Sequence, residues 1–198
     1  MNRYKHLTDL TLPGNSLHLH RAAHSLRQGG IWAYPTEAVW GLGCDPDCDD
    51  AVLDLLAMKQ RPWEKGLIMV ASGVHQIEHL LAPLEPGMRE RIMGYWPAPV
   101  TVLVPDYEHQ VSPLVRGSHD SVAVRVSAYQ PVIDLCDAFG GPLVSTSCNP
   151  AGRAPARYVW QVRQYFQGQL DGILPGRVGG ATRPSRIIDA ISGRVLRS

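Results

Sequence analysis

The stretch SVAVRVSAYQPVIDLCDAFGGPLVSTSCN, residues 121–149, places a strand, a helix and a second strand in close succession. Residues 122–126 are rich in valine, which is typical of a buried strand. Residues 131–139 begin with proline and are followed by two glycines, which is how helices commonly start and stop. Residues 143–145 form the next apolar strand. A strand, a helix and another strand in this order predict an α/β fold.

The remainder of the chain extends this alternation in both directions. Residues 36–47 read as a loop rich in glycine and proline, and residues 186–191 and 195–197 read as a late hairpin around Ser192-Gly193. The order of elements therefore predicts one α/β domain with a mixed sheet and flanking helices. Further helices are predicted over 15–28, 49–58, 74–81, 86–95 and 158–166, and further strands over 31–34, 66–71, 100–104 and 173–174.

Length and composition limit the class of protein. The chain has 198 residues, which suits one well-buried domain, and its 44% apolar and 19% charged residues are a globular balance. No run approaches the length of a membrane span, and the N-terminus lacks the apolar core of a signal peptide. The four cysteines form no disulfide or zinc pattern and read as reduced thiols. We therefore expect a cytoplasmic protein that does not bind membranes.

Charge is distributed unevenly along the chain. The net charge is only +1, but residues 151–198 hold eight arginines, no lysine and two acids. A basic C-terminal third can attract a nucleotide or a nucleic acid. Arginines spread along a segment need not share a face, so ordinary surface solvation is the alternative.

Two short polar segments end apolar elements that lie far apart in the sequence. Lys59-Gln60-Arg61 follows the helix predicted over 49–58, and Ser145-Thr146-Ser147-Cys148-Asn149 follows the strand predicted at 143–145. Cations neutralise phosphates, while hydroxyls and loop N–H groups orient them. In open α/β sheets, ligands lie beyond the carboxyl ends of strands. The two segments together predict a nucleotide-phosphate site.

One metal-like motif competes with this interpretation. His75-Gln76-Ile77-Glu78-His79 matches the H-x-x-E-H pattern of a zinc protease. The segment is short, follows a strand directly and has no partner carboxylate at a suitable place downstream. A zinc hydrolase built on His75 and His79 is therefore a weaker alternative.

Several blocks in the chain resemble the YrdC-type threonylcarbamoyl-AMP synthases, the bacterial TsaC proteins. The resemblance spans residues 15–198, implies the short single-domain form with a concave ligand cavity, and leaves residues 1–14 as an N-terminal extension. Two positions depart from the pattern: Cys148 stands where alanine is usual, and Pro150 follows the asparagine. The matching blocks occur in family order and cover residues 34–46, 56–68, 96–101, 121–126, 142–149, 183–187 and 196–197.

The resemblance implies an ATP-dependent nucleotidyltransferase. Such enzymes join L-threonine, bicarbonate and ATP into threonylcarbamoyl-AMP and release pyrophosphate. Partner proteins then transfer the threonylcarbamoyl group to an adenosine beside the anticodon of certain tRNAs. Magnesium would accompany ATP, without an assigned protein ligand. The main alternative is a non-catalytic module that binds double-stranded RNA or tRNA in ribosome maturation.

The same resemblance assigns residues to each substrate. Lys59, Arg61, Ser147 and Asn149 would be the catalytic residues, because they would hold the reacting phosphates. Arg125 would pair with the carboxylate of threonine, and Ala38 would pack against the amino acid. The full ATP-binding set is Lys59, Arg61, Lys65, Ser121, Ser147, Asn149 and Arg197, and the threonine-binding set is Thr36, Ala38, Arg125, Ser145 and Ser185.

Individual residues also have purely structural interpretations. Arg61 could serve only as a cation at a helix C-terminus. Arg125 lies in an apolar strand and could belong to a buried ion pair. Ser145 could be an ordinary hydroxyl at the end of a strand.

Overall fold

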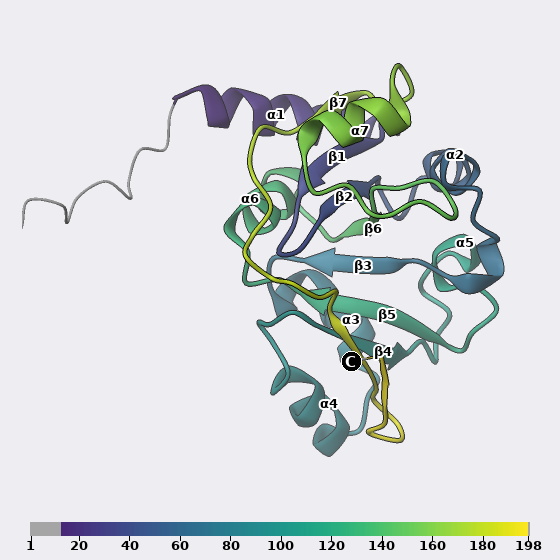
Figure 1. Ribbon diagram of the computed structural model, residues 1–198. Coiled ribbons are helices and arrows are strands. Elements are labelled where there is room, and N and C mark those ends of the chain that lie inside the picture. The colour runs from purple at the N-terminus through teal and green to yellow at the C-terminus, as the bar shows by residue number, and fades with distance from the viewer. Residues whose placement is uncertain (1–12, 198) are drawn as a thin grey trace, which may run out of the picture.

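A computed structural model describes residues 13–197 of the protein and contains one nine-stranded sheet (Figure 1). The predicted extension over residues 1–14 lies almost wholly outside the described residues. The strands are ordered β7-β1-β2-β6-β3-β5-β4-β8-β9. Their bounds are β1 Trp32–Pro35, β2 Trp40–Gly43, β3 Ile68–Ala71, β4 Val100–Pro105, β5 Ser121–Val126, β6 Leu143–Ser147, β7 Gly172–Ile173, β8 Arg186–Asp189 and β9 Val195–Arg197.

The sheet is mixed, which confirms the predicted fold class. Strands β3 and β5 are parallel, as are β4 and β8, while β6 runs antiparallel to both of its neighbours, β2 and β3. The strand–helix–strand stretch from β5 to β6 thus contributes the two strands that flank β3.

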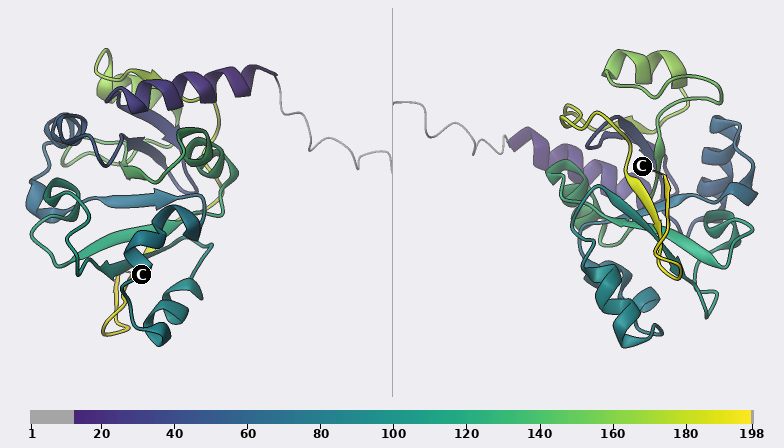
Figure 2. Two further views of the ribbon diagram at one scale, coloured as in Figure 1. Left: turned by 180° about the vertical axis from the view of Figure 1, so that it is seen from behind. Right: turned by 60° about the horizontal axis from the view of Figure 1, so that its bottom comes forward.

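Helices cover both faces of the sheet. In the right-hand view of Figure 2, α1 and α6 lie on one side, and α2 and α5 lie on the other. None of the helices within residues 13–197 is both long and apolar enough to cross a membrane. The helical bounds are α1 Pro13–Arg27, α2 Asp49–Lys59, η1 Trp63–Lys65, η2 Val74–Ile77, α3 Glu78–Leu81, α4 Pro86–Met93, α5 Pro113–Arg116, α6 Gln130–Phe139 and α7 Val159–Phe166.

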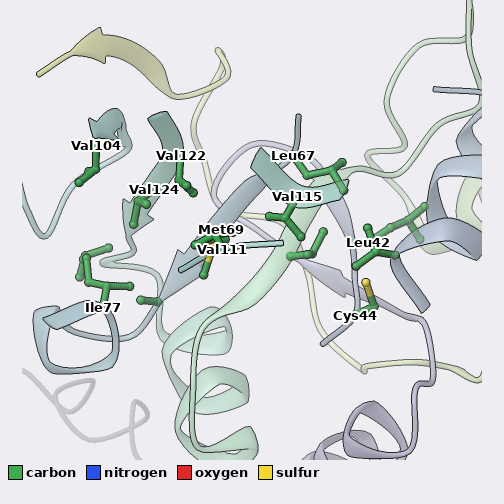
Figure 3. Packing of buried hydrophobic residues seen from close by; sticks show 14 of the residues in the cluster. Leu42, Cys44, Leu67, Met69, Ile77, Val104, Val111, Val115, Val122 and Val124 are labelled. Atoms are coloured by element: carbon green, nitrogen blue, oxygen red, sulfur yellow. The ribbon is translucent and has the colours of Figure 1, made fainter. Parts of the chain in front are cut away.

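Two apolar clusters fill the space between the sheet and its helices. Successive side chains of a strand point to opposite faces, so Met69 joins the larger cluster while its neighbour Val70 joins the smaller one. Figure 3 shows part of the larger cluster, where Met69, Val122 and Val124 of adjacent strands meet. The smaller cluster lies beneath α1 and α6 and includes Tyr34.

The structure corrects several local predictions. Residues 40–43, predicted as part of a loop, form strand β2, and short helices occur at η1 and α5. Aspartate commonly caps helices, but Asp49 does not cap α2: Cys48 is the N-cap, and the Asp49 carboxylate accepts a hydrogen bond from Ser112 Oγ at 2.6 Å. The H-x-x-E-H segment is divided between η2 and α3, and Glu78 forms an ion pair with Arg89 at 2.7 Å.

The β2 strand depends on close backbone approach at Gly43. A Cβ atom there would lie 2.5 Å from the Val144 carbonyl oxygen and 2.8 Å from the Tyr34 ring. We expect Gly43→Ala to destabilise the protein by about 1–3 kcal/mol, the usual cost of overpacking a core. Gly87→Ala is the matched control, because its Cβ would meet nothing within 4 Å. That change in α4 should stabilise by up to about 1 kcal/mol, and denaturant unfolding of both variants measures the difference.

Candidate functional site

A cavity of about 240 Å³ lies on the face of the sheet that also carries α1 and α6. The register explains this placement: Val70, whose side chain faces α6, pairs with both Arg125 and Leu143. Side chains two residues apart share a face, so Ser145 and Ser147 project to the same side as Leu143. The cavity therefore opens above the centre of the sheet, beyond the part that the helices cover.

The cavity joins segments from most of the chain. Eight of the predicted site residues line it, while Lys59, Lys65, Ser121 and Asn149 do not. Strands β1, β2, β3, β5, β6 and β9 or the loops that follow them all contribute. The eight are Thr36, Ala38, Arg61, Arg125, Ser145, Ser147, Ser185 and Arg197.

The lining is strongly basic. Four arginines face one glutamate among the residues that form the wall of the cavity, and no lysine or aspartate is present there. A concave site with one sign of charge concentrates ions of the opposite sign. A second, larger cavity of about 590 Å³ is lined by Asp45, Asp47 and Asp137 and holds neither lysine nor arginine. The smaller cavity is therefore the one suited to phosphate and carboxylate groups.

Lys59 joins the two polar segments singled out in the sequence. It is the last residue of α2, and its side chain is only 6% exposed. The Lys59 ammonium donates hydrogen bonds to the backbone carbonyls of Ser147 and Asn149, the latter at 2.9 Å. Burial lowers the pKa of Lys59 to about 8. Lys59 thus lies beneath the loop that follows β6 and fixes its backbone.

Arg61 lies at the rim beside the end of α2. The chain turns at Gln60, whose φ of 51° is left-handed, and Arg61 then lines the cavity. Its guanidinium donates to the Gly66 carbonyl at 2.7 and 3.1 Å and to the Lys65 carbonyl at 3.3 Å. Burial lowers the pKa of Arg61. Lys65 itself is exposed and outside the lining.

Hydrogen bonds of Ser147 and Asn149 hold the loop that follows β6. Ser147 Oγ donates to Asn149 Oδ1 at 2.6 Å, and the Asn149 amide donates to the carbonyls of Pro150 and Arg153 at 3.1 and 2.8 Å. Ser147 therefore faces the cavity while Asn149 holds the loop behind it. Ser121 begins β5 at the same end of the sheet as this loop, since Ile68 of β3 pairs with both Ser145 and Ala123, but it does not line the cavity.

The Thr36 turn and Ser145 form the floor of the cavity. Thr36 is buried, and its hydroxyl donates to the Val39 carbonyl at 2.7 Å. Ala38 is 7% exposed and Ser145 6%, so both present only small faces to the cavity. Beneath them, burial raises the pKa of Tyr34 far above its ordinary value. The Tyr34 hydroxyl therefore remains protonated.

Arg125 forms an ion pair, as its purely structural interpretation predicted. Its Nη1 lies 3.5 Å from Glu37 Oε2, with the two side chains 11% and 15% exposed. Arg125 nevertheless lines the cavity, and its Nε atom is buried with no hydrogen-bond partner among the described residues. The guanidinium therefore retains a free donor beside the cavity.

Ser185 and Arg197 complete the opposite wall. Arg197 donates to the Ser185 carbonyl at 2.8 and 3.0 Å and to its hydroxyl at 3.2 Å. The Ser185 hydroxyl lies 2.8 Å from that of Thr101, in β4. Burial, and secondarily repulsion by Arg125, lowers the pKa of Arg197. Two guanidinium groups near enough to repel each other favour an anion between them.

Two charged residues of the lining, Glu37 and Arg183, were not assigned from the sequence. Glu37 follows Thr36 at the end of β1, and Arg183 precedes Ser185 in a block that carries the family resemblance. Their positions next to assigned residues were the available signal. Of the eight arginines in residues 151–198, only Arg183 and Arg197 line the cavity, so most of the basic C-terminal third lies elsewhere.

Comparisons with known proteins all point to relatives of one family. Residues 24–198 match the Sua5, YciO and YrdC family model, which is described as "Telomere recombination". A threonylcarbamoyl-AMP synthase from Marinobacter nauticus is 54% identical over 91% of this chain and 95% of its own length. One from Hahella chejuensis is 50% identical over 90% and 97%. The solved structure of P. abyssi Sua5 complexed with L-threonine is 30% identical, with a TM-score of 0.78, and the match covers 86% of this chain and 50% of that protein.

Proposed function

The chain belongs to the Sua5, YciO and YrdC family, and from this we propose that it is a threonylcarbamoyl-AMP synthase. It would form L-threonylcarbamoyladenylate and pyrophosphate from L-threonine, bicarbonate and ATP. The observation that carries the proposal is the convergence of Arg61, Ser147 and Arg125, from three distant segments, on one basic cavity. The curated relatives match over nearly their whole length and bear this activity in their names.

The cavity suits a reaction that depends on positioning. The threonine amine would first join bicarbonate, with loss of water, to give a carbamate. A carbamate oxygen would then attack the innermost phosphorus of ATP, and pyrophosphate would leave. Such a step needs the reactants aligned and the charge of the phosphates neutralised. Arg61 and Ser147 line the cavity together, and Arg125 and Ser145 lie on β5 and β6, the two strands that flank β3. We assign the first pair to the phosphates and the second pair to threonine.

The cavity is smaller than a complete nucleotide site. Pockets for drug-sized ligands usually measure about 300–1,000 Å³, whereas this one measures about 240 Å³. We therefore place threonine and the reacting phosphates inside it and the adenosine at its mouth. Lys65 and Ser121, which do not line the cavity, would contact the nucleotide only from outside.

Magnesium would arrive with the nucleotide. Among the described residues that line the cavity, Glu37 is the one carboxylate, and Ser127 and Arg125 already contact it. Magnesium in nucleotide sites is commonly held by phosphate oxygens and water together with one or two carboxylates. We propose that the phosphates supply most of its ligands here.

The enzymatic proposal is favoured over the RNA-binding alternative. The relatives that match over the full domain are named as synthases, and the fold resembles a protein solved with L-threonine. In the cell, we propose that the product passes to proteins that transfer the threonylcarbamoyl group to tRNA in the cytoplasm.

A direct assay tests the proposal. Purified protein should release pyrophosphate from ATP only when L-threonine and bicarbonate are both present, and mass spectrometry should detect the adenylate. Pyrophosphate release that is independent of threonine would contradict the assigned acceptor. Absence of pyrophosphate, together with RNA affinity that falls steeply with salt, would favour the binding module.

A further inference from the structure

The acidic group of the cavity has unmet hydrogen-bonding capacity. Glu37 Oε2 is buried without a hydrogen-bond partner among the described residues, and so is Arg125 Nε of the same ion pair. The pair is 3.5 Å apart, which is long for a charged hydrogen bond. Buried polar groups are almost always satisfied, so an orphaned acceptor beside an orphaned donor points to a ligand.

The other carboxylate oxygen of Glu37 is held firmly. Ser127 Oγ donates to Glu37 Oε1 at 2.6 Å, and the same hydroxyl accepts from the Tyr129 amide at 3.1 Å. Because Tyr129 supplies one hydrogen, the Ser127 hydrogen is directed at Glu37. Ser127 is fully buried. The carboxylate therefore has a fixed orientation, with Oε1 hydrogen-bonded to Ser127 and Oε2 beside Arg125 but without a hydrogen bond.

The backbone around Glu37 is also tied in place. The segment between β7 and β8 runs along the sheet past the end of β1 (Figure 1). Along this segment, the Ala181 amide donates to the Glu37 carbonyl at 3.1 Å, and the Gly179 amide donates to Thr36 at 2.9 Å. A Cβ at Gly179 would lie 2.7 Å from the Glu37 carbonyl oxygen. This close contact fixes the position of the Glu37 backbone, and with it the base of the side chain.

A free acceptor next to a free guanidinium donor is the complement of an α-amino acid zwitterion. We propose that Glu37 binds the α-ammonium group of the amino-acid substrate while Arg125 binds its carboxylate. Glu37 would thereby select substrates with a free charged amine. This assignment rests on the proposed function, because it names the recognition of the substrate of that same cavity. Since Ser127 and Arg125 already share the carboxylate, the role is binding rather than proton abstraction.

Two threonine analogues test the assignment in the unmodified protein. In 2,3-dihydroxybutanoate a hydroxyl replaces the amine, and in threonine amide the carboxylate is lost. Calorimetric titration with ATP present and bicarbonate absent should show both binding on the order of 10²-fold more weakly than L-threonine, the scale expected when a hydrogen bond to a charged group is lost. Binding of the dihydroxy acid within about threefold of threonine would overturn the proposal.

Glu37→Gln separates the two halves of the recognition. The variant should bind threonine and the dihydroxy acid within about threefold of each other, since the preference for the ammonium is lost. It should still discriminate strongly against threonine amide, because Arg125 remains. A general structural defect would weaken both preferences together. Glu90→Gln, an exposed glutamate of α4 outside the cavity, is the matched control and should retain both.

The outcomes distinguish this inference from the proposed function. Retention of the ammonium preference in Glu37→Gln would overturn the role of Glu37 and leave the synthase proposal intact. Threonine binding with a clear ammonium preference, but without pyrophosphate release when bicarbonate is added, would support Glu37 and contradict the synthase. If Glu37→Gln fails to fold, the analogue titrations of the unmodified protein still decide the question.

Discussion

Lys59→Met is expected to lower threonine-dependent pyrophosphate release by at least about 10²-fold, the scale of loss when a catalytic group is misplaced by an ångström. Methionine fills the buried space but cannot donate to the carbonyls of Ser147 and Asn149. The loop that carries the Ser147 hydroxyl would lose its anchor, and the phosphate site would lose a nearby positive charge. Turnover measured at saturating ATP and threonine tests this expectation.

The same variant should remain folded but become less stable. A buried carbonyl without a partner costs about 1–3 kcal/mol, and Lys59 satisfies two of them. In a protein of this size each kcal/mol lowers Tm by about 2–4 °C. Arg163→Met is the comparison, since that arginine of α7 is exposed and outside the lining. We expect it to change turnover by less than about threefold, as is usual for exposed charges, and equal losses would contradict the assignment.

The lowered pKa of Lys59 predicts opposite pH trends for stability and activity. Its pKa falls from 10.5 to about 8 on folding, so between these values the unfolded chain binds more protons. Unfolding free energy should therefore rise with pH from about 8 to 10.5. If the ammonium is needed, kcat/KM for ATP should fall over the same interval. Subtracting the pH profiles of Lys59→Met from those of the unmodified protein isolates the contribution of Lys59 to stability and to activity. Parallel profiles for the two proteins would argue against a role of the Lys59 ammonium.

The sequence predicted the central strands well because their signals are local. Strands β4, β5 and β6 are valine-rich or apolar runs, with proline directly before β4 and β6, and helix α6 carries both start and stop signals. Strand β2 was missed because two of its four residues are glycines, which are depleted in strands. Its glycines are required by contacts with Tyr34 and Val144, which no local pattern reveals.

The site was predicted as far as residue types reveal chemistry. Cations and hydroxyls identify an anion site, so Arg61, Ser147 and Arg197 could be anticipated. Glu37 was not assigned, because a carboxylate in a phosphate site reads as unfavourable until its partner is known. Ser127, which orients it, lies 90 residues away in the chain. Likewise, the position of Lys59 beneath the loop depends on how α2 meets β6, which only the tertiary structure defines.

The second large effect concerns Arg125. Arg125→Gln should raise KM for threonine by at least about 10²-fold while changing KM for ATP by less than about threefold, because truncating one partner of a buried charge pair commonly costs several kcal/mol. Arg125 lies on β5 beside β3 and faces Glu37, away from the end of α2 that carries Arg61. Arg163→Gln, at an exposed position of α7, is the control and should alter neither constant. Similar increases in both constants would contradict a specific carboxylate contact.

A double variant separates the ligand role of Arg125 from its ion pair. Removing Arg125 alone leaves the Glu37 carboxylate without its partner, and unpaired buried charges are strongly destabilising. Arg125→Gln combined with Glu37→Gln removes both charges, so much of the lost stability should return. Threonine binding should not return with it, because neither end of the zwitterion then has a charged partner. Recovery of turnover together with stability would mean that the pair serves only the fold.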